Sequence, residues 1–502
     1  KKALDLLNQA KPLFSSASIK DDLLSARWDV ANAAALSGQG YFNKAAEILV
    51  ERTTFFGGRA IKQETFVDEK GNLKSRRLSD EDYRSRAGEY GDVLTLLART
   101  YGNQGELKKA DSTFVMAASW LKKNLDRYSR EYIAAQFYNA NLLVENGNEQ
   151  LPEEMDYGRL LNSLKANHKP THYLATQIYE AYLRQLLRSG SNRYFNVKLE
   201  YEKLINKEFK STSVYPVRLK ALEFDSKLSR DKTKNLETMA SNLLANAKGL
   251  PKYNLVAAEL NDFLAGLAIQ EKKYTTTEFY LKNIVDIKTD LFGEAAPETH
   301  LAKIHLANYY LDYTNNIAEA ERIYYNSFIQ IVEKEIGAWH KDHLNILNHM
   351  AILYELTDKY KDASAVLDKA LTISRAKYSD TDYEFGNELT NIARLQIKLG
   401  EYEKAEANIA RALKVLEEFR KDETKTVYII NAIDTEAVLF GIKGLFDEAE
   451  ENLDRSSKLI LKSNVALVGI DELATARELS SLFIQLGRYA RTEELLGGLL
   501  EE

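Results

Sequence analysis

Histidines are the residues of this 502-residue chain whose spacing first suggests chemistry, because neutral imidazoles are common metal ligands. His340 and His343 lie three residues apart and would share one face of a helix, but His349 would lie off that face. His300 and His305, five residues apart, do not share a helical face. The chain has no Cys to complete a ligand set and no His-Glu-x-x-His motif. The pattern therefore predicts packing and capping roles for the histidines and no bound metal.

Catalytic motifs are missing from the sequence as well. It has no Gly-x-Ser-x-Gly elbow, no Walker loop and no dinucleotide-binding fingerprint. Without Cys there is no thiol nucleophile and no disulfide framework. Neighbouring carboxylates such as Glu417 and Glu418 point to different sides of a helix, so solvated faces explain them. We expect no enzymatic activity, no cofactor and no small-molecule substrate.

The overall composition limits the class of partner and the type of fold that the chain can have. A formal charge of −6 argues against a nucleic-acid binder with many phosphate contacts. No apolar run approaches the roughly 18 residues that a membrane-spanning helix needs, so no membrane insertion is expected. With only 6 Pro and 24 Gly, the chain is predicted to form long helices joined by short connections.

A recurring turn organises these helices. It pairs an aromatic residue or Leu with an Ala three positions later, as in Tyr360 and Ala363 or Tyr402 and Ala405. About twelve residues before the turn Ala lies another small residue on an apolar helical face, such as Ala351. Each unit is therefore predicted to be a helical hairpin that buries its apolar face only by stacking on its neighbours. The later turns end at residues 277, 320, 363, 405, 449 and 492, in steps of 42–44 residues.

These motifs resemble the tetratricopeptide repeat, and the period resembles the longer repeats of kinesin light chains and many bacterial proteins. The resemblance rests on Leu347-Asn348-His349-Met350-Ala351-Ile352-Leu353-Tyr354 in a first helix, and on connections that contain Gly293 or Gly337. It is strong over 257–500, good at 24–53 and 88–122, and weak from about 129 to 250. It implies an all-α, right-handed α-solenoid of about eleven helix-turn-helix repeats.

The repeat spacing predicts one continuous solenoid with four regions. Its first region resembles one helix of a truncated leading repeat, and its last holds the regular 43-residue repeats. Between them we expect N-terminal repeats and then degenerate hairpins at about 129–167, 171–209 and 215–248. The four regions are 1–23, 24–128, 129–250 and 251–502.

An insertion at 55–86 interrupts this period. The turn alanines Ala45 and Ala110 are 65 residues apart, which leaves about twenty residues in excess of one repeat. Residues 64–74 read as a short β-hairpin or a loop, with a turn at Lys70-Gly71-Asn72. A surface decoration and a docking element both fit this pattern.

The resemblance also indicates which side chains would bind a partner, because the first helix of each hairpin lines the concave groove of such arrays. Asn recurs at these positions in four successive repeats, and its amide offers a donor and an acceptor to the backbone of an extended peptide. An empty, hydrated groove would show the same residue type. The expected partner-binding residues are Asn308, Asn345, Asn348, Asn387, Thr390, Arg394, Asn431, Asp434 and Arg477.

A clamp for the C-terminal carboxylate of chaperones is not expected in this groove. Tetratricopeptide domains of that kind place Lys and Arg beside their asparagines. The corresponding positions in three successive repeats lack the basic residues. They hold Ile304 and Asn308, then His349, then Asn387 and Asn391.

Together these features predict a non-catalytic scaffold that binds a partner peptide or helix in its groove. One alternative is the sensor or regulatory repeat region of a larger protein with a caspase-like protease domain beyond Glu502. Another is a structural component of a bacterial envelope secretion or motility assembly. The chain begins at Lys1 instead of Met and stops at Glu502, so we interpret it as a piece of something longer. The absence of Cys fits an exported bacterial protein, although a cytosolic chain can lack Cys too. Both the cytoplasm and the bacterial periplasm or envelope remain open as its location.

Overall fold

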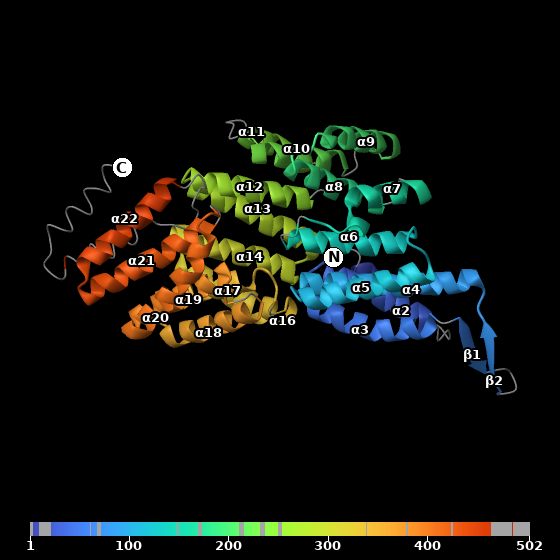
Figure 1. The fold of residues 1–502 in the computed structure, drawn as a ribbon, viewed down its shortest axis with the longest axis horizontal. Coiled ribbons are helices and arrows are strands. Elements are labelled where there is room, and N and C mark those ends of the chain that lie inside the picture. The colour runs from blue at the N-terminus through green and yellow to red at the C-terminus, as the bar shows by residue number, and fades with distance from the viewer. Residues whose placement is uncertain are drawn as a thin grey trace. The chain divides into compact units, whose positions relative to one another are not determined.

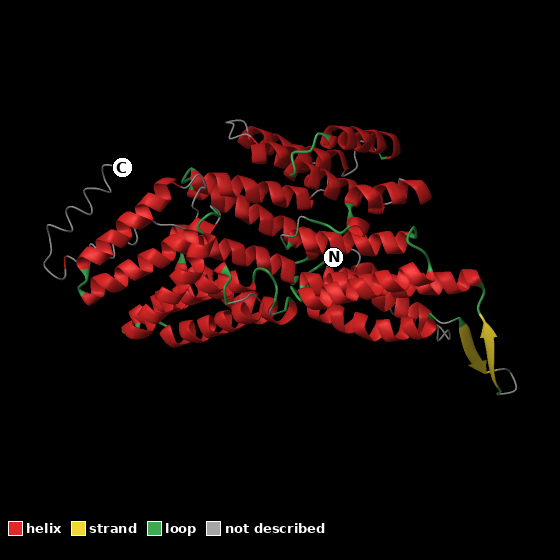
Figure 2. Ribbon diagram, viewed as in Figure 1, coloured by secondary structure: helices red, strands yellow, loops and turns green. Residues whose placement is uncertain are grey.

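The computed structural model describes residues 4–9, 22–60, 62–67, 72–146, 148, 150–168, 173–209, 215–230, 236–248, 254–337, 339–377, 380–422, 425–462 and 484. Helices make up nearly all of this part, and one pair of strands is the β-structure that accompanies them (Figure 2). The prediction of an all-α fold with short connections is therefore confirmed. Within these ranges, no helix combines the length and the apolar character that a membrane crossing requires.

Contacts between Cα atoms divide the chain into two compact units, and each is described by itself. The first unit comprises residues 1–267, 275–303 and 326–340. The second unit comprises residues 268–274, 304–325 and 341–502.

The helices from α2 to α13 make up most of the first unit and are coloured blue to yellow-green in Figure 1. Residues 4–9 are helical as well. Two helices occupy each of the three ranges expected to hold degenerate hairpins. The helices are α2 (Asp22–Ser37), α3 (Phe42–Arg59), α4 (Asp80–Asn103), α5 (Leu107–Asn124), α6 (Arg130–Glu145), η1 (Glu153–Met155), α7 (Tyr157–Asn167), α8 (Tyr173–Arg188), α9 (Arg193–Glu208), α10 (Tyr215–Arg230), α11 (Leu236–Lys248), α12 (Asn254–Gln270) and α13 (Tyr274–Phe292).

The regular repeats continue through α14 (Pro297–Tyr309) into the second unit. Two short elements, η4 (Tyr325–Val332) and α16 (Glu333–Glu335), lead to the connection before α17. The remaining elements are η3 (Tyr310–Thr314), α15 (Ile317–Tyr324), α17 (His343–Leu356), α18 (Tyr360–Lys377), α19 (Tyr383–Lys398), α20 (Tyr402–Leu416), η5 (Glu417–Phe419), α21 (Thr426–Lys443) and α22 (Phe446–Lys462).

The turns inside seven of the described hairpins share one backbone conformation. Two residues before the second helix of each of these seven, the chain adopts a positive φ, which Gly tolerates best. The next backbone N–H then bonds back across the end of the first helix, as from Glu401 to the Gln396 carbonyl at 2.8 Å. This closure satisfies a carbonyl that the helix end would leave unpaired. The residues with positive φ are Gly40, Gly105, Lys272, Asn315, Asp358, Gly400 and Gly444, with Lys, Asn or Asp in three repeats.

Paired alanines lie where the two helices of a hairpin cross. Each pair consists of one residue on the first helix and one on the second, twelve positions later, and a side chain this small lets the backbones approach closely. Clusters of buried apolar residues form around these pairs, each drawn from neighbouring helices. The pairs are Ala33 and Ala45, Ala98 and Ala110, Ala351 and Ala363, Ala393 and Ala405, and Ala437 and Ala449, all with 0% exposure.

One repeat departs from this register. Ala307 and Ala320 are separated by one residue more than the other alanine pairs. The first helix of this repeat ends in a π-helical turn, η3, and the closing hydrogen bond runs from Asn316 to the carbonyl of Tyr310, one residue further back than elsewhere. A π-turn holds one extra residue within a helix, so η3 absorbs the insertion without disturbing the hairpin.

The insertion between α3 and α4 forms a β-hairpin. Strand β1 (Gln63–Val67) pairs antiparallel with β2 (Leu73–Arg77), with Glu64 opposite Arg76. The two strands run from Gln63 to Arg77 and include most of the expected segment 64–74, while residues 70 and 71 of the expected turn lie outside the described residues. Ser79 then caps α4 by accepting a hydrogen bond from the Asp82 N–H at 3.0 Å.

The first unit also contains contacts between segments far apart in the sequence. The hydroxyl of Tyr41 donates to the carbonyl of Ala295 at 2.8 Å, and the Glu298 N–H donates to the Gln39 carbonyl at 3.2 Å. Asn43 donates to the Lys334 carbonyl at 2.7 Å. The turn after α2 and the start of α3 are therefore held against the connection before α14, the first turn of α14 and the short helix α16. We call these contacts the clasp.

Aromatic stacking and one close backbone approach complete the clasp. The rings of Phe42 and His340 stack with centroids 6.0 Å apart, and both residues are buried. Gly105, at φ +79°, lies so close to Trp339 that a Cβ on it would fall 1.7 Å from the Trp339 carbonyl oxygen. Only Gly fits that position without a shift of the backbone.

Candidate functional site

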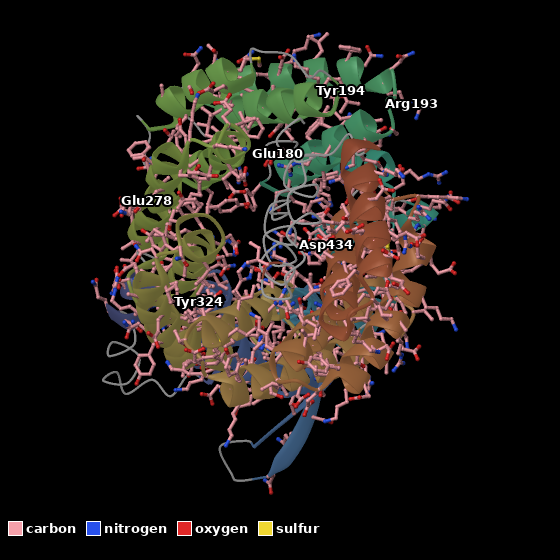
Figure 3. All side chains as sticks on the ribbon, turned by 90° about the vertical axis from the view of Figure 1, so that its left-hand side faces the viewer. Glu180, Arg193, Tyr194, Glu278, Tyr324 and Asp434 are labelled. Atoms are coloured by element: carbon pink, nitrogen blue, oxygen red, sulfur yellow. The ribbon has the colours of Figure 1, made fainter. Side chains whose placement is uncertain are left out.

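The side chains predicted to bind a partner lie on first helices of the regular repeats, together with neighbouring polar groups. Asn308 is on α14, Asn345 and Asn348 are on α17, and the others are on α19 and α21. Arg477 lies outside the described residues. The described residues belong to the second unit, and Figure 3 labels Asp434 of α21 among them.

Asn308 is engaged at both ends of its amide. The hydroxyl of the buried Tyr324 donates to its oxygen, and its amino group donates to Oδ1 of Asn345 at 3.0 Å. This second bond joins first helices of successive repeats. Asn345 is exposed and keeps its own amino group free of any described partner. Asn308 therefore stabilises the stack, while Asn345 retains two donor hydrogens.

Asn348 is also bound within the protein. Its amino group donates to Oε1 of Glu388 on the next repeat at 2.8 Å, and Asn391 donates to the same carboxyl group. Oδ1 of Asn348 and Oε2 of Glu388 are buried and have no hydrogen-bond partner among the described residues. This pair is a second link between first helices, and it is incompletely satisfied.

Burial changes the acidity of the carboxyl groups beside this link. It raises the pKa of Glu388 to about 7, against the hydrogen bonds from Asn348 and Asn391, which favour the ionised form. Burial also raises the pKa of Glu384 to about 7. Burial, and after it the charges of both carboxyls, raise the pKa of Tyr428 on α21. These acidic groups were not predicted from the sequence, although Glu384 and Glu388 are four residues apart on one helical face.

Thr390 is 2% exposed, and its hydroxyl donates to the Gly386 carbonyl at 3.0 Å. The same arrangement recurs in the N-terminal repeats, where Thr95 donates to the Gly91 carbonyl at 2.8 Å. The two threonines stand at the same place relative to the alanine crossings. In this structure the Thr390 hydroxyl therefore faces its own helix.

The amides of Asn387 and Asn431 are available. Both side chains are half-buried, and neither amide has a partner among the described residues. Nearby, Arg394 lies 3.8 Å from Oε1 of the buried Glu355. Lys398 donates to Oε2 of the same carboxylate at 2.9 Å. The structure thus separates the predicted asparagines. Asn308 and Asn348 bind the neighbouring repeats, Asn345 keeps only its amino group without a described partner, and Asn387 and Asn431 offer whole amide groups.

The histidines have separate structural roles. The His300 ring bonds the Ser327 hydroxyl at 3.0 Å, and burial lowers the pKa of His300 to about 4. His349 contacts Asp312 at 3.2 Å and the Asn345 carbonyl at 2.8 Å. The described residues contain no group of three or more His, Asp or Glu side chains placed to hold a metal.

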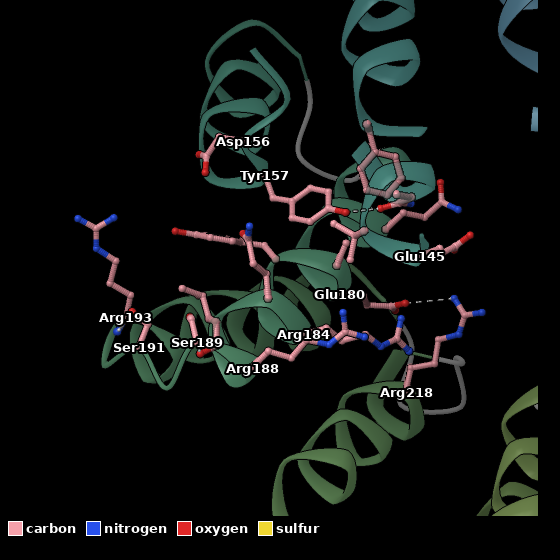
Figure 4. Close-up of a pocket in the computed structure, with 18 of the residues that line it drawn as sticks. Glu145, Asp156, Tyr157, Glu180, Arg184, Arg188, Ser189, Ser191, Arg193 and Arg218 are labelled. Atoms are coloured by element: carbon pink, nitrogen blue, oxygen red, sulfur yellow. Dashed lines mark hydrogen bonds and ion pairs between the residues drawn. The ribbon is translucent and has the colours of Figure 1, made fainter. Parts of the chain in front are cut away.

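A cavity of about 710 Å³ lies in the first unit, where the sequence had indicated no site. It is lined by residues of α6, α7, α8, α9 and α10 (Figure 4). One stripe of α8 supplies much of the wall, since its lining residues recur every three or four positions. That stripe contains Tyr173, Gln177, Ala181, Arg184 and Arg188.

Arginines from three elements reach this cavity. Arg184 and Arg188 come from α8, Arg193 from the start of α9 and Arg218 from α10. Arg218 lies 3.5 Å from Oε2 of Glu180. Figure 3 labels Glu180 and Arg193. The other three guanidinium groups have no ion pair with a described residue.

Acidic and amide groups complete the lining. Glu180 is 8% exposed, and burial raises its pKa against the opposing effects of Arg218 and of the Tyr201 hydroxyl. The Tyr157 hydroxyl donates to Oδ1 of Asn141 at 2.7 Å, which fixes the Asn141 amide and leaves its amino group unpaired. The sequence carried one signal of this site, the two like charges of Arg184 and Arg188 four residues apart.

One segment of the chain matches a known family. The sequence model of the tetratricopeptide repeat matches residues 389–415, which include most of α19 and α20. No curated protein sequence matches the chain significantly.

Three solved structures show a general likeness to the chain. BtubC (BKLC) from P. vanneervenii is 17% identical, with 45% of this chain and 91% of that chain covered and a TM-score of 0.38. A Rap protein complexed with competence and sporulation factor is 16% identical, with coverage of 65% and 97% and a TM-score of 0.43. A signal-transduction ATPase with a tetratricopeptide repeat sensor from Pyrococcus horikoshii is 14% identical, with coverage of 85% and 65% and a TM-score of 0.42. Similarity at this level supports no functional inference.

The matched segment shares its structural features with the repeats before and after it. It contains the alanine crossing of Ala393 and Ala405 and the left-handed turn at Gly400, and both features recur at steps of 42–44 residues on either side. Repeats of this kind bind protein partners, so the chain is a protein-interaction or regulatory repeat region. The protein is a tetratricopeptide repeat protein, an all-α solenoid of helix-turn-helix units.

Proposed function

We propose that the second unit binds an extended segment of a partner protein along its first helices α17, α19 and α21, without catalysis. The amides of Asn345, Asn387 and Asn431 would pair with the peptide backbone, and Arg394, Asp434 and Arg477 would select among side chains. The observation that supports this most directly is the contrast between Asn308 and Asn348, whose amides are bound within the protein, and the free amides of Asn387 and Asn431.

The chemistry of a side-chain amide suits this task. Each amide carries two donor hydrogens and an oxygen acceptor, which match the carbonyl and N–H groups of an extended backbone. Successive repeats place such amides at regular intervals, so one peptide can be held at several points. Hydrogen bonds to the backbone confer affinity with little dependence on the peptide sequence.

Selection of binding peptides tests this proposal. Phage-displayed random dodecapeptides are selected against the full chain, and calorimetry then gives the affinity of the enriched peptides. The double variant Asn387→Ala, Asn431→Ala should bind them about tenfold or more weakly, because each lost hydrogen bond contributes about 0.5–1.5 kcal/mol. Its thermal unfolding should match that of the wild type.

Two further variants serve as controls. Asn103→Ala removes an exposed amide of α4 in the first unit and should leave peptide binding unchanged. Asn308→Ala should lower the stability of the stack, since Tyr324 and Asn345 both lose a partner. Failure to enrich any peptide, or equal affinity of the double variant and the wild type, would contradict the proposal.

A further inference from the structure

We propose that the cavity between α6, α8 and α10 binds a carboxylate carried on an apolar body, whether a free organic acid or the side chain or C-terminus of a peptide. This site belongs to the first unit and is independent of the peptide-binding face proposed for the second.

The charge of the lining favours an anion. Four guanidinium groups face three carboxylates, those of Glu145, Asp156 and Glu180. Glu180 already pairs with Arg218, and Asp156 caps α7 by accepting from the Arg159 N–H at 2.9 Å. The remaining guanidinium groups therefore exceed the acidic groups available to them.

Arg184 and Arg188 show that this excess of positive charge has a cost. They lie one turn apart on α8, and like charges at that spacing repel and weaken a helix. No described carboxylate lies within ion-pair distance of either of them, although the charge of Arg184 favours the ionised form of Glu180. A bound carboxylate between them would remove the repulsion and accept paired hydrogen bonds from a guanidinium group.

Neutral donors are also positioned in the cavity. The Tyr157 hydroxyl holds Oδ1 of Asn141, so both amino hydrogens of Asn141 remain for a ligand. Gln177 is held between two tyrosines, accepting from Tyr138 at 3.0 Å and donating to the Tyr173 hydroxyl at 3.2 Å. These bonds order the polar wall before any ligand arrives, which lowers the entropy cost of binding.

The rest of the lining fits an apolar body. Phe137, Val144 and Leu186 contribute hydrocarbon surface, and Tyr173 is 57% exposed at the rim. A volume of about 710 Å³ is typical of sites for small organic ligands and far exceeds an inorganic ion. The single net positive charge of the lining matches one carboxylate better than a phosphate dianion.

Calorimetry on the full chain with defined probes tests the inference. The carboxylate probes are octanoate and two N-acetylated tetrapeptides, Leu-Glu-Leu-Leu with an amidated C-terminus and Leu-Gln-Leu-Leu with a free C-terminus. N-acetylated Leu-Gln-Leu-Leu with an amidated C-terminus is the neutral probe, and inorganic phosphate is titrated for comparison. We expect a probe that carries a carboxylate to bind at least tenfold more tightly than the neutral tetrapeptide. The three charged probes then distinguish a free acid, a side chain and a C-terminus as the source of the carboxylate.

Variants assign the binding to this cavity. Arg184→Gln and Arg188→Gln should each weaken it about tenfold, and Arg188→Lys should have a smaller effect because the charge remains. Arg159→Gln, an exposed arginine of α7 outside the lining, is the matched control and should bind like the wild type. Circular dichroism shows whether each variant keeps the wild-type helicity.

Three binding results on the wild-type chain would overturn the proposal. They are equal binding of the neutral tetrapeptide, no binding of any charged probe at millimolar concentration, and tighter binding of inorganic phosphate than of every carboxylate. Equal affinity of helical Arg184→Gln and Arg188→Gln variants for the charged probes would exclude the cavity as the site.

Discussion

The hydroxyl of Tyr41 donates a 2.8 Å hydrogen bond to the carbonyl of Ala295, a residue 254 positions further along the chain. In an ideal repeat array each repeat contacts only its neighbours, so contacts of this range are not expected. Here the clasp adds them within the first unit, together with the bond from Asn43 to Lys334. The stability of this unit therefore depends on contacts that no single hairpin supplies.

Substitution of Gly105 tests the clasp. Gly105→Ala places a Cβ 1.7 Å from the Trp339 carbonyl oxygen and keeps a φ of +79° that an L-residue disfavours. We expect a loss of at least about 2 kcal/mol in unfolding free energy, the sum of backbone strain and displaced packing. Urea unfolding measures it. Gly190→Ala, with φ +65° and open space around the new Cβ, carries the strain alone and should cost about 1 kcal/mol. Equal losses for the two variants would mean that the contact with Trp339 contributes nothing.

Gly386 and Leu416 form a close contact between the helices of one hairpin. A Cβ on Gly386 would lie 2.8 Å from Cγ of Leu416, so Gly386→Ala should lower stability by about 1–3 kcal/mol. Leu416→Ala removes buried volume and should cost about 2–5 kcal/mol alone. In the double variant the new methyl group occupies part of that space, so the combined loss should be smaller than the sum. Additive losses in a double-mutant cycle would contradict the direct contact.

Glu388 makes the second unit less stable at neutral pH than at acidic pH. Its pKa in the folded chain is about 7, above the ordinary value of 4.5, because burial disfavours the ionised form. Between these values the folded state binds more protons than the unfolded state, so stability falls as pH rises from about 4.5 to 7, by up to about 3 kcal/mol. Glu388→Gln keeps an oxygen to accept from Asn348 and removes the charge. We expect it to flatten the pH dependence of denaturant unfolding and to raise stability at pH 7.5. An unchanged slope would show that Glu388 is not the titrating group.

His349 is expected to give a pH dependence of the same sign, in a window that begins near 6.5. Burial disfavours its charged form, but the hydrogen bond and charge of Asp312 outweigh that effect and raise the pKa of His349 above 6.5. Its contribution to stability is fully present below the unfolded pKa and is lost as pH rises through the folded value. NMR titration of the imidazole should show the raised pKa, and Asp312→Asn should lower it. A pKa that is the same in the wild type and in Asp312→Asn would exclude the ion pair.

Much of the architecture could be read from the sequence because its signals are local. The alanine crossing at Ala393 and Ala405 needs only residues of one hairpin, and so does the turn closed after Gly400. The β-hairpin in the insertion is equally local. The π-helical turn η3 was not predicted, although the extra residue between Ala307 and Ala320 is visible in the sequence.

Whether a candidate side chain bonds within the protein depends on residues of other repeats. Asn348 and Asn387 are the same residue type on equivalent faces, yet one is bound to Glu388 and the other is free. That difference depends on which group the next repeat presents about 40 residues later. Arg184 and Arg188 likewise form a site only because α6, α9 and α10 enclose the space in front of them.

The sequence by itself determined the repeat, its period and its helical hairpins, since these follow from periodic apolar faces and from turn residues a few positions apart. Only the tertiary structure decided which asparagines bond to a neighbouring repeat, where the cavity lies and how Tyr41 contacts Ala295. Those features depend on hydrogen bonds and packing between residues tens to hundreds of positions apart, and no local pattern specifies such distances.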